Sequence, residues 1–275
     1  MKKIEKQKIE YFKKNYKPNG ILRDPVDDRD LTISKIKTLN AEYPPIVESA
    51  SWKKLRVKNQ QRTNSCAGQS GDTAIEDIEF RNGRGELDFS PLWIYYNARK
   101  LSGLQDRDAG CYLRDVCKVL CNQGIALEEH WPFDASKVLT APSAISNFFA
   151  GLFKQDSYYR CYTVEDIMEA LTKGYSVMIG TAVFESYYKA TGGDFTVKLP
   201  ADGEQNYGGH AVSCQMVDRL NTRVGVQGSW GTGFGNGGFY YLSYEFLVKY
   251  GYDIWAVKPK RINWITKTMR KIFGK

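Results

Sequence analysis

The spacing of apolar residues changes near the middle of this chain, and this change constrains the fold more than any other feature. Between residues 61 and 134, apolar side chains recur every three or four positions, as they do on the buried face of a helix. After a linker rich in Ser, Ala and Pro at 135–147, short runs rich in Val, Ile and Tyr alternate with glycine-containing turns, which is typical of strands. A helical half followed by a strand half predicts an α+β fold.

Local signals place the expected elements. Ser90 and Pro91 form a favourable start for one helix, and Gly83 and Gly124 end two others. We expect helices over 66–82, 90–104, 112–123 and 164–174, and strands over 45–60, 157–163, 175–183, 210–217, 222–228 and 237–242. The strand within 45–60 is inferred from alternation around Leu55 and Val57.

Positive charge is concentrated at the two ends of the chain. The formal charge is +8 over 275 residues, but residues 1–18 hold seven Lys against two Glu, and residues 258–275 hold seven Lys or Arg and no acid. The body between them is therefore net acidic, which argues against a nucleic-acid-binding domain. We predict a basic helix at 1–18 and an extended leader at 19–44, which together form an N-terminal arm. The basic tail at 258–275 also holds apolar residues, so an anionic surface such as a membrane or a nucleic acid, a partner assembly and the acidic body are all open to it as docking sites. A solvated basic end that packs a few apolar residues locally is an equal alternative.

Histidine and cysteine counts limit the chemistry. The two histidines, His130 and His210, leave two candidates for an imidazole base and exclude a metal site built on several histidines. The six cysteines include no C-x-x-C pair, which predicts free thiols in a reducing compartment. No apolar run is long enough for a signal peptide or a membrane span. These features predict a cytoplasmic protein without a metal or other cofactor.

Three further candidates for metal or catalytic roles are better explained as structural. His130 follows the third predicted helix in a turn, which favours a structural or surface position. Cys117 and Cys121 are one helical turn apart, as metal ligands can be, but Val116 and Leu120 beside them indicate a buried helix face.

Cys66 is expected at the junction of a polar loop and a helix. The positive end of a helix favours the thiolate, which is the nucleophilic form of cysteine. Its neighbours Ser65, Ala67 and Gly68 are small and leave room for a substrate, although a lone cysteine is more commonly structural. A catalytic thiol also needs a base, and His210 follows two glycines at the start of a predicted strand, where an imidazole can face a cleft.

Several segments together resemble the papain-like cysteine peptidases. Val-Lys-Asn-Gln at 57–60 ends six residues before Cys66, at the place of the family's glutamine. The segments 206–217 and 229–242 are similar to the family's histidine strand and to its Ser-Trp-Gly block. The segment 108–133 looks like the bacterial or bacteriophage branch.

The resemblance covers about 45–257 and implies a two-lobed papain-like fold. A helical lobe at about 61–134 would precede an antiparallel, β-barrel-like lobe at about 135–257, with the active-site cleft between them. In this reading, residues 1–44 are the arm and leader, and the catalytic domain ends before the tail at 258.

The resemblance also implies roles for individual residues. Cys66 would be the nucleophile, and His210 would activate it and later protonate the leaving amine. Gln60 would donate to the oxyanion together with the backbone N–H of Cys66. The implied substrate-binding positions are Ala109, Gly110, Gly209 and Trp230, the last of which also shields the active-site hydrogen bonds from water.

The sequence departs from the family in three places. The family's asparagine that orients the histidine is replaced by Gly228, and a glycine side chain cannot orient an imidazole. A backbone carbonyl, a water or Gln227 would have to act instead, or catalysis is weakened. The tryptophan after the nucleophile is replaced by Ala67, and the two positions of the family's cleft disulfide hold Thr63 and Arg107.

The sequence therefore predicts a cysteine endopeptidase that cleaves protein or peptide substrates through a thioester acyl-enzyme. Its predicted setting is the cytosol of a bacterial host or a virion. Three alternatives remain. The first is a catalytically impaired papain-like protein with a binding or structural role, suggested by Gly228. The second is a related acyl-transfer hydrolase such as a cell-wall peptide hydrolase, and the third is a nucleic-acid-binding protein that acts through its two basic ends. Whether residues 1–44 cover the cleft is left open by the sequence.

Overall fold

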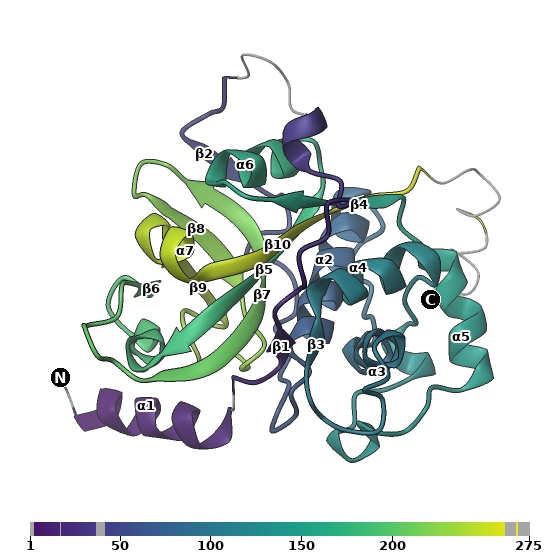
Figure 1. The fold of residues 1–275 in the computed structure, drawn as a ribbon, viewed down its shortest axis with the longest axis horizontal. Helices are drawn as coiled ribbons and strands as arrows, with labels where there is room; N and C mark the ends of the chain where they lie inside the picture. Colours follow the sequence, from purple (N-terminus) through teal and green to yellow (C-terminus); the bar gives the residue numbers. More distant parts are fainter. Residues whose placement is uncertain (1–2, 17, 37–41, 262–267, 269–275) are drawn as a thin grey trace.

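The computed structural model of the chain describes residues 3–16, 18–36, 42–261 and 268. They form a helical lobe and a sheet lobe that lie side by side, with an N-terminal segment passing between them (Figure 1). The predicted α+β fold, with a helical lobe preceding a β lobe, is confirmed. Within the described residues, no helix is long and apolar enough to cross a membrane.

The helical lobe is built on three helices, α2 (Cys66–Arg81), α3 (Pro91–Leu101) and α4 (Leu113–Asn122). Two glycines allow α2 to approach its neighbours closely. A Cβ atom at Gly68 would lie 2.5 Å from the carbonyl oxygen of Pro91, and one at Gly71 would lie 2.6 Å from a methyl group of Val116. This contact on two sides holds α2, and with it Cys66 at its first turn, in a fixed position.

The β lobe is a single sheet whose central strand is β7 (Asn206–Asp218). The strand order is β4-β10-β5-β7-β8-β9-β6, and β2 pairs with the end of β7. Neighbours are antiparallel except for β6 and β9. Within the described residues β4 and β6 do not pair, so the sheet stays open and does not close into a barrel. The other strands are β2 (Ile46–Glu48), β4 (Ser157–Cys161), β5 (Ser176–Phe184), β6 (Thr196–Val197), β8 (Arg223–Gln227), β9 (Phe239–Ser243) and β10 (Gly251–Lys258).

Three shorter helices complete the two lobes, α5 (Ala144–Ala150), α6 (Val164–Thr172) and α7 (Tyr244–Tyr250). The helix predicted over 164–174 is α6, and it begins at a capping box between Thr163 and Asp166. α5 begins inside the segment that the sequence suggested to be a linker, and it is capped by Ser143.

A buried carboxylate joins the lobes. Asp77 of α2 accepts hydrogen bonds from Arg81 at 2.7 Å and from Ser51 at 2.5 Å, and it also bonds the hydroxyl groups of Ser49 and Ser176. Ser176 begins β5, and Ser49 directly follows β2. Because Asp77 bonds groups from both lobes, it fixes the base of α2 against the sheet.

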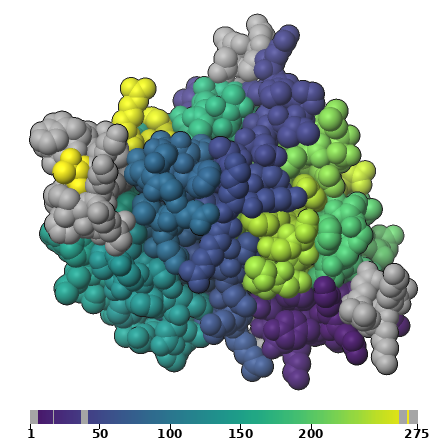
Figure 2. Space-filling model, turned by 180° about the vertical axis from the view of Figure 1, so that it is seen from behind, coloured from purple at the N-terminus to yellow at the C-terminus, as the bar shows by residue number. Residues whose placement is uncertain are grey.

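The predicted strand around Leu55 and Val57 is wrong. The only strand in that segment is β2, at its beginning, and residues 51–55 form turns. The alternation of apolar and polar residues has another cause. Trp52 and Leu55 lie in consecutive turns and both are buried, and Trp52 packs against Phe239. On the face shown in Figure 2, the indigo chain of this region lies between the teal helical lobe and the green β lobe.

The N-terminal arm contacts both lobes. Its helix α1 (Lys3–Asn15) lies against the β lobe, and the following chain crosses between the lobes (Figure 1). There β1 (Ile21–Leu22) pairs in parallel with β3 (Cys111–Tyr112) of the helical lobe. The predicted N-terminal helix is therefore confirmed over 3–15, whereas almost all of the basic tail lies outside the described residues.

Candidate active site

Cys66 is the first residue of α2, and its side chain is completely buried. The side chain of Ser65 makes no capping hydrogen bond, so it does not occupy the backbone N–H groups of the first turn. The N–H groups of Cys66 and Ala67 favour the thiolate, and the N–H of Ala211 donates to Sγ at 3.4 Å. The loop-to-helix junction predicted for this cysteine is confirmed.

Strand β7 brings His210 to the cysteine from the opposite lobe. The next residue, Ala211, donates to the Cys66 sulfur, so the imidazole and the thiol belong to facing edges of the two lobes. The indole of Trp230 packs on the imidazole with ring centres 4.5 Å apart. Both ring nitrogens of His210 are buried, and neither has a hydrogen-bond partner among the described residues.

Gln60 is fixed by hydrogen bonds to the residue that precedes Trp230 and to the loop before α2. Its backbone N–H donates to the carbonyl of Ser229 at 2.8 Å, and its side-chain oxygen accepts from the Ser229 hydroxyl at 2.7 Å. The side-chain nitrogen donates to the carbonyl of Thr63 at 2.9 Å. This bond uses one of the two hydrogens of the amide, so the other remains for a reacting carbonyl. Such a held donor needs no reorganisation when negative charge develops.

Trp230 covers His210 and is itself covered by the arm. Its exposed fraction is 2%. Tyr188 stacks on it at 5.5 Å between ring centres, and Tyr16 and Phe12 of the arm stack at 5.6 and 6.4 Å. The position suits the shielding role that the sequence suggested for Trp230.

The leader occupies the place that the sequence assigned to a substrate. Gly110 has φ +76, and a Cβ atom there would lie 2.6 Å from the carbonyl oxygen of Asn19. On the other side, Asn19 forms a parallel bridge with Gly209. A Cβ atom at Gly20 would overlap the sulfur of Cys66. The backbone of residues 19–20 therefore lies directly over the nucleophile.

The turn that carries Ala109 is held from within the helical lobe. The hydroxyl of Tyr95 donates to Asp108 at 2.6 Å and accepts from the backbone N–H of Gly110 at 2.9 Å. Ala109 lies between these two anchors and is partly exposed. Since Gly110 contacts Asn19, this turn forms one wall of the cleft.

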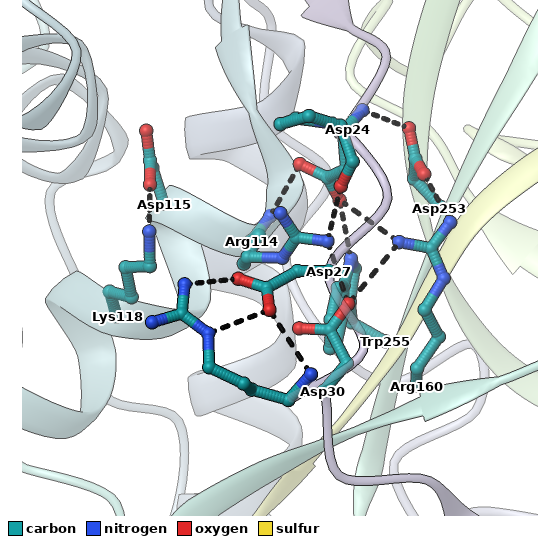
Figure 3. A network of polar contacts seen from close by, with 11 residues as sticks. Asp24, Asp27, Asp30, Arg114, Asp115, Lys118, Arg160, Asp253 and Trp255 are labelled. Atoms are coloured by element: carbon teal, nitrogen blue, oxygen red, sulfur yellow. Dashed lines mark hydrogen bonds and ion pairs between the residues drawn. The ribbon is translucent and has the colours of Figure 1, made fainter.

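A polar cluster fastens the leader to both lobes just beyond the cleft (Figure 3). Asp24 accepts hydrogen bonds from the indole N–H of Trp255 at 2.7 Å and from the backbone N–H of Arg114 at 3.2 Å. The backbone N–H of Asp24 donates to Asp253 at 2.7 Å. Burial, followed by the charge of Asp253, raises the pKa of Asp24 to about 6. Because Arg114 belongs to α4 and the other two partners to β10, Asp24 contacts both lobes.

Two arginines complete this cluster. Arg114 donates to Asp30 at 2.6 Å, and Arg160 of β4 donates to Asp253 at 2.6 Å and lies 3.8 Å from Asp24 (Figure 3). We call Asp24, Asp30, Asp253, Arg114 and Arg160 the clasp. It sets three carboxylates against two guanidinium groups, which makes it sensitive to protonation.

Burial leaves the cysteine and the histidine uncharged. It raises the pKa of Cys66 to about 12 and lowers the pKa of His210 to about 3. In both cases the loss of contact with water is the main cause, because it disfavours the charged form. At neutral pH the closed structure therefore holds a thiol and a neutral imidazole.

The site holds several residues that the sequence did not indicate. Tyr240 lies where a side chain at Gly228 would extend: a Cβ atom there would be 2.8 Å from its ring and 2.9 Å from its hydroxyl oxygen. The hydroxyls of Tyr240 and Tyr187 are 2.9 Å apart. Tyr252 covers Gly209. Tyrosines in apolar runs look like core residues in a sequence, so no signal pointed to these three.

The remaining candidates lie away from this site. His130 stacks on Phe149 at 4.7 Å between ring centres, in the structural position expected for it. Cys117 is fully buried and Cys121 partly buried on α4, as expected for a packed helix face. No group of residues suited to hold a metal ion was found in the described part of the chain.

Sequence and structure comparisons agree with this geometry. No family model matches the chain. An uncharacterized peptidase C1-like protein of Acanthamoeba polyphaga mimivirus is 30% identical over 270 residues, which covers 87% of this chain and 86% of that protein. Among solved structures, xylellain, a cysteine protease from Xylella fastidiosa, is 26% identical with a TM-score of 0.82, and the match covers 89% of this chain and 97% of xylellain. Procathepsin B from Trypanosoma congolense has the same fold, at 15% identity and a TM-score of 0.63, over 92% of this chain and 89% of that one.

The two-lobed fold and the cleft with its cysteine and histidine define a papain-like hydrolase of the thiol protease class. The chain belongs to the papain-like cysteine peptidases, the peptidase C1 family. The family predicted from the sequence is therefore confirmed, whereas its assignment to a bacterial or bacteriophage branch stays a prediction.

Proposed function

We propose that this chain is a cysteine endopeptidase that hydrolyses peptide bonds through a thioester on Cys66, and that the structure is its closed, resting state. The observation that carries the proposal is the convergence of three groups from separate segments. The Cys66 sulfur accepts from the backbone beside His210, and Gln60 is fixed by the residue that precedes Trp230. The catalytic unit would comprise 45–257, with the arm as a cover.

In the proposed reaction, His210 takes the proton of Cys66, and the thiolate attacks the substrate carbonyl. The carbonyl oxygen becomes negatively charged, and the free N–H of Gln60 and the backbone N–H of Cys66 donate to it. His210 then gives its proton to the leaving amine as the C–N bond breaks and the thioester remains. A water, deprotonated by His210, releases the acid product and restores the thiol.

The leader would control this reaction by occupying the cleft. It covers the nucleophile with residues 19–20, pairs with the walls at Gly110 and Gly209, and keeps the catalytic pair uncharged. An extended substrate would use the same walls, which supports substrate-binding roles for Ala109, Gly110 and Gly209. A peptide and the leader cannot bind there together.

The test uses the full chain with Gly20→Gln, a neutral side chain that has no room beside Cys66. The matched control is Gly151→Gln, because a Cβ atom at Gly151 meets no atom within 4 Å. We expect iodoacetamide at pH 7 to alkylate Cys66 at least 10-fold faster in Gly20→Gln than in the wild type or the control. We also expect Gly20→Gln to cleave a fluorogenic peptide library, and Cys66→Ala to abolish that cleavage.

An open cleft with an ordinary thiol would contradict the proposal. If Cys66 in Gly20→Gln reacts no faster than free cysteine and no peptide is cleaved, the chain is a papain-like protein with a binding role. Cleavage of cell-wall peptides but not of protein-derived peptides would instead indicate the related acyl-transfer hydrolase.

A further inference from the structure

Within the part of the chain that the structure describes, His210 lacks a hydrogen-bond acceptor that its proposed chemistry requires. When His210 takes the proton of Cys66, both of its ring nitrogens carry hydrogen, and one N–H faces away from the sulfur. A buried charged donor without an acceptor is costly. The family's asparagine would accept here, but this chain has Gly228.

Gln227, the nearest amide in sequence, is already committed elsewhere. Its nitrogen donates to the carbonyl of Arg56 at 2.9 Å, and its oxygen accepts from Gln215 at 3.3 Å. Both ends of the side chain are therefore hydrogen-bonded to groups other than the imidazole.

Two buried tyrosines fill the space that Gly228 leaves. A Cβ atom at Gly228 would lie 2.9 Å from the hydroxyl oxygen of Tyr240, so this hydroxyl stands at the root of the missing side chain. The hydroxyl of Tyr187 lies 2.9 Å from that of Tyr240. The ring of Tyr187 meets the imidazole of His210 edge to face at 6.4 Å between centres.

The same tyrosines are electrostatically close to the nucleophile. Burial is the main cause that raises the pKa of Tyr240 and of Tyr187, and the charge of Cys66 adds to it in both cases. Both hydroxyls therefore stay protonated at any working pH. A hydroxyl in this state donates one hydrogen bond and still accepts another.

We propose that the Tyr240 hydroxyl, supported by Tyr187, replaces the family's asparagine as the group that accepts the N–H of protonated His210 and so orients the ring. In the closed structure His210 is neutral and its ring nitrogens have no hydrogen-bond partner among the described residues, and the contact forms when it gains the proton. The hydrogen of Tyr240 is then directed to the oxygen of Tyr187. Both tyrosines are positioning residues, and the proposal rests on the proposed Cys66 and His210 mechanism.

The test compares single hydroxyl deletions in full-length Gly20→Gln. Tyr240→Phe removes the acceptor, and Tyr241→Phe is the matched control because Tyr241 faces the other side of β9, near Trp52. We expect Tyr240→Phe to lower kcat between about 10-fold and 100-fold with KM within about twofold, as for a misplaced catalytic group. The alkaline limb of the pH profile should move to lower pH, because the imidazolium loses its acceptor. Tyr187→Phe should give a smaller change in the same direction.

A rescue variant separates this role from a merely structural one. Gly228→Asn combined with Tyr240→Leu makes room for the family's asparagine, and we expect it to recover most of the kcat lost in Tyr240→Phe. Equal activity and pH profiles for Tyr240→Phe and Tyr241→Phe would overturn the proposal.

An NMR titration of the imidazoles needs no substrate, so it tests the role of Tyr240 and Tyr187 even where no peptide is cleaved. The chain has two histidines, so the His210 signal is readily assigned with His130 as reference. In Gly20→Gln, Tyr240→Phe should shift the titration of His210 to lower pH and leave His130 unchanged. An inactive Gly20→Gln with this shift present would refute the proposed function alone, whereas an unchanged His210 titration would refute the tyrosine pair.

Discussion

A methyl group added to Gly20 would overlap the sulfur of Cys66, so the leader crosses the proposed nucleophile at a position where only a glycine fits. The leader is held there from both ends. Tyr16 stacks on Trp230 before the crossing, and Asp24 bonds Trp255 after it. Closure therefore depends on the contacts of the arm, and substitutions in the arm can change it while Cys66 and His210 stay intact.

The state of the catalytic pair should change when the leader moves. In the wild type, burial raises the pKa of Cys66 to about 12 and lowers that of His210 to about 3, so alkylation should stay slow from pH 5 to 9. Displacing the leader with Gly20→Gln returns water to both groups, which lowers the first pKa and raises the second. We expect the alkylation rate of this variant to become substantial near neutral pH. A parallel pH profile in the two proteins would show that the leader does not set these pKa values.

The clasp should make closure depend on pH through Asp24. Its pKa is about 6 when docked and near 4 when the leader is free, so the docked state binds the proton more tightly. Docking is therefore strongest below pH 4 and loses up to about 3 kcal/mol as the pH rises through 6. Asp24→Asn imitates the protonated form, so its leader should dock more tightly at pH 7 than the leader of the wild type. The measurement is the ratio of the Cys66 alkylation rate in the wild type to that in Asp24→Asn. We expect this ratio to rise from pH 5 to 7.

The control for this prediction is Asp28→Asn, since Asp28 is exposed and belongs to the same stretch of leader. Its alkylation should follow the wild type at every pH. If the ratio falls with rising pH, the charged Asp24 carboxylate stabilises docking through the clasp by more than its burial costs.

The sequence indicated where the proposed catalytic groups lie, but it did not indicate that the leader covers them. Helix α2 and strand β7 follow from periodicity and glycine signals, and these two elements bring Cys66 and His210 together. The leader's docking depends on close backbone approaches at Gly20 and Gly110, and a glycine in a sequence does not reveal which atoms will lie against it. Likewise, Tyr240 is spaced like any core residue, and only the packing shows that it faces Gly228.

Gln60 should matter for the attack on the carbonyl and little for the reactivity of the thiol. In the Gly20→Gln background, Gln60→Ala removes the side-chain donor and should lower kcat/KM for a peptide by about 100-fold to 1000-fold. The rate of Cys66 alkylation, which forms no oxyanion, should change less than about threefold. Ser229→Ala keeps the amide but removes its partner at 2.7 Å, so its effect should lie in between. Equal losses in both assays after Gln60→Ala would point to a general disturbance of the cleft.

Tyr252 should set the size of the substrate side chain that binds beside Gly209. Ile21 of the leader is buried here: a Cβ atom at Gly209 would lie 2.6 Å from its methyl group and 3.3 Å from the Tyr252 ring. A substrate that takes the leader's place would put a side chain where Ile21 lies, so branched aliphatic residues should be preferred over aromatic ones. Tyr252→Ala should raise kcat/KM for a peptide with Phe at that position relative to one with Ile by at least 10-fold.

The matched control for Tyr252 is Phe148→Ala, which removes an exposed aromatic side chain on α5. Its ratio of Phe to Ile peptides should equal that of the parent Gly20→Gln. Arg23 stacks on Tyr252 at 4.5 Å, so Tyr252→Ala also weakens the leader and should raise the overall rate in a wild-type leader background. A weaker leader raises the rates for both peptides by the same factor, so the ratio of the Phe peptide to the Ile peptide reports on the pocket alone. If Tyr252→Ala leaves this ratio unchanged, Ile21 does not mark a substrate subsite.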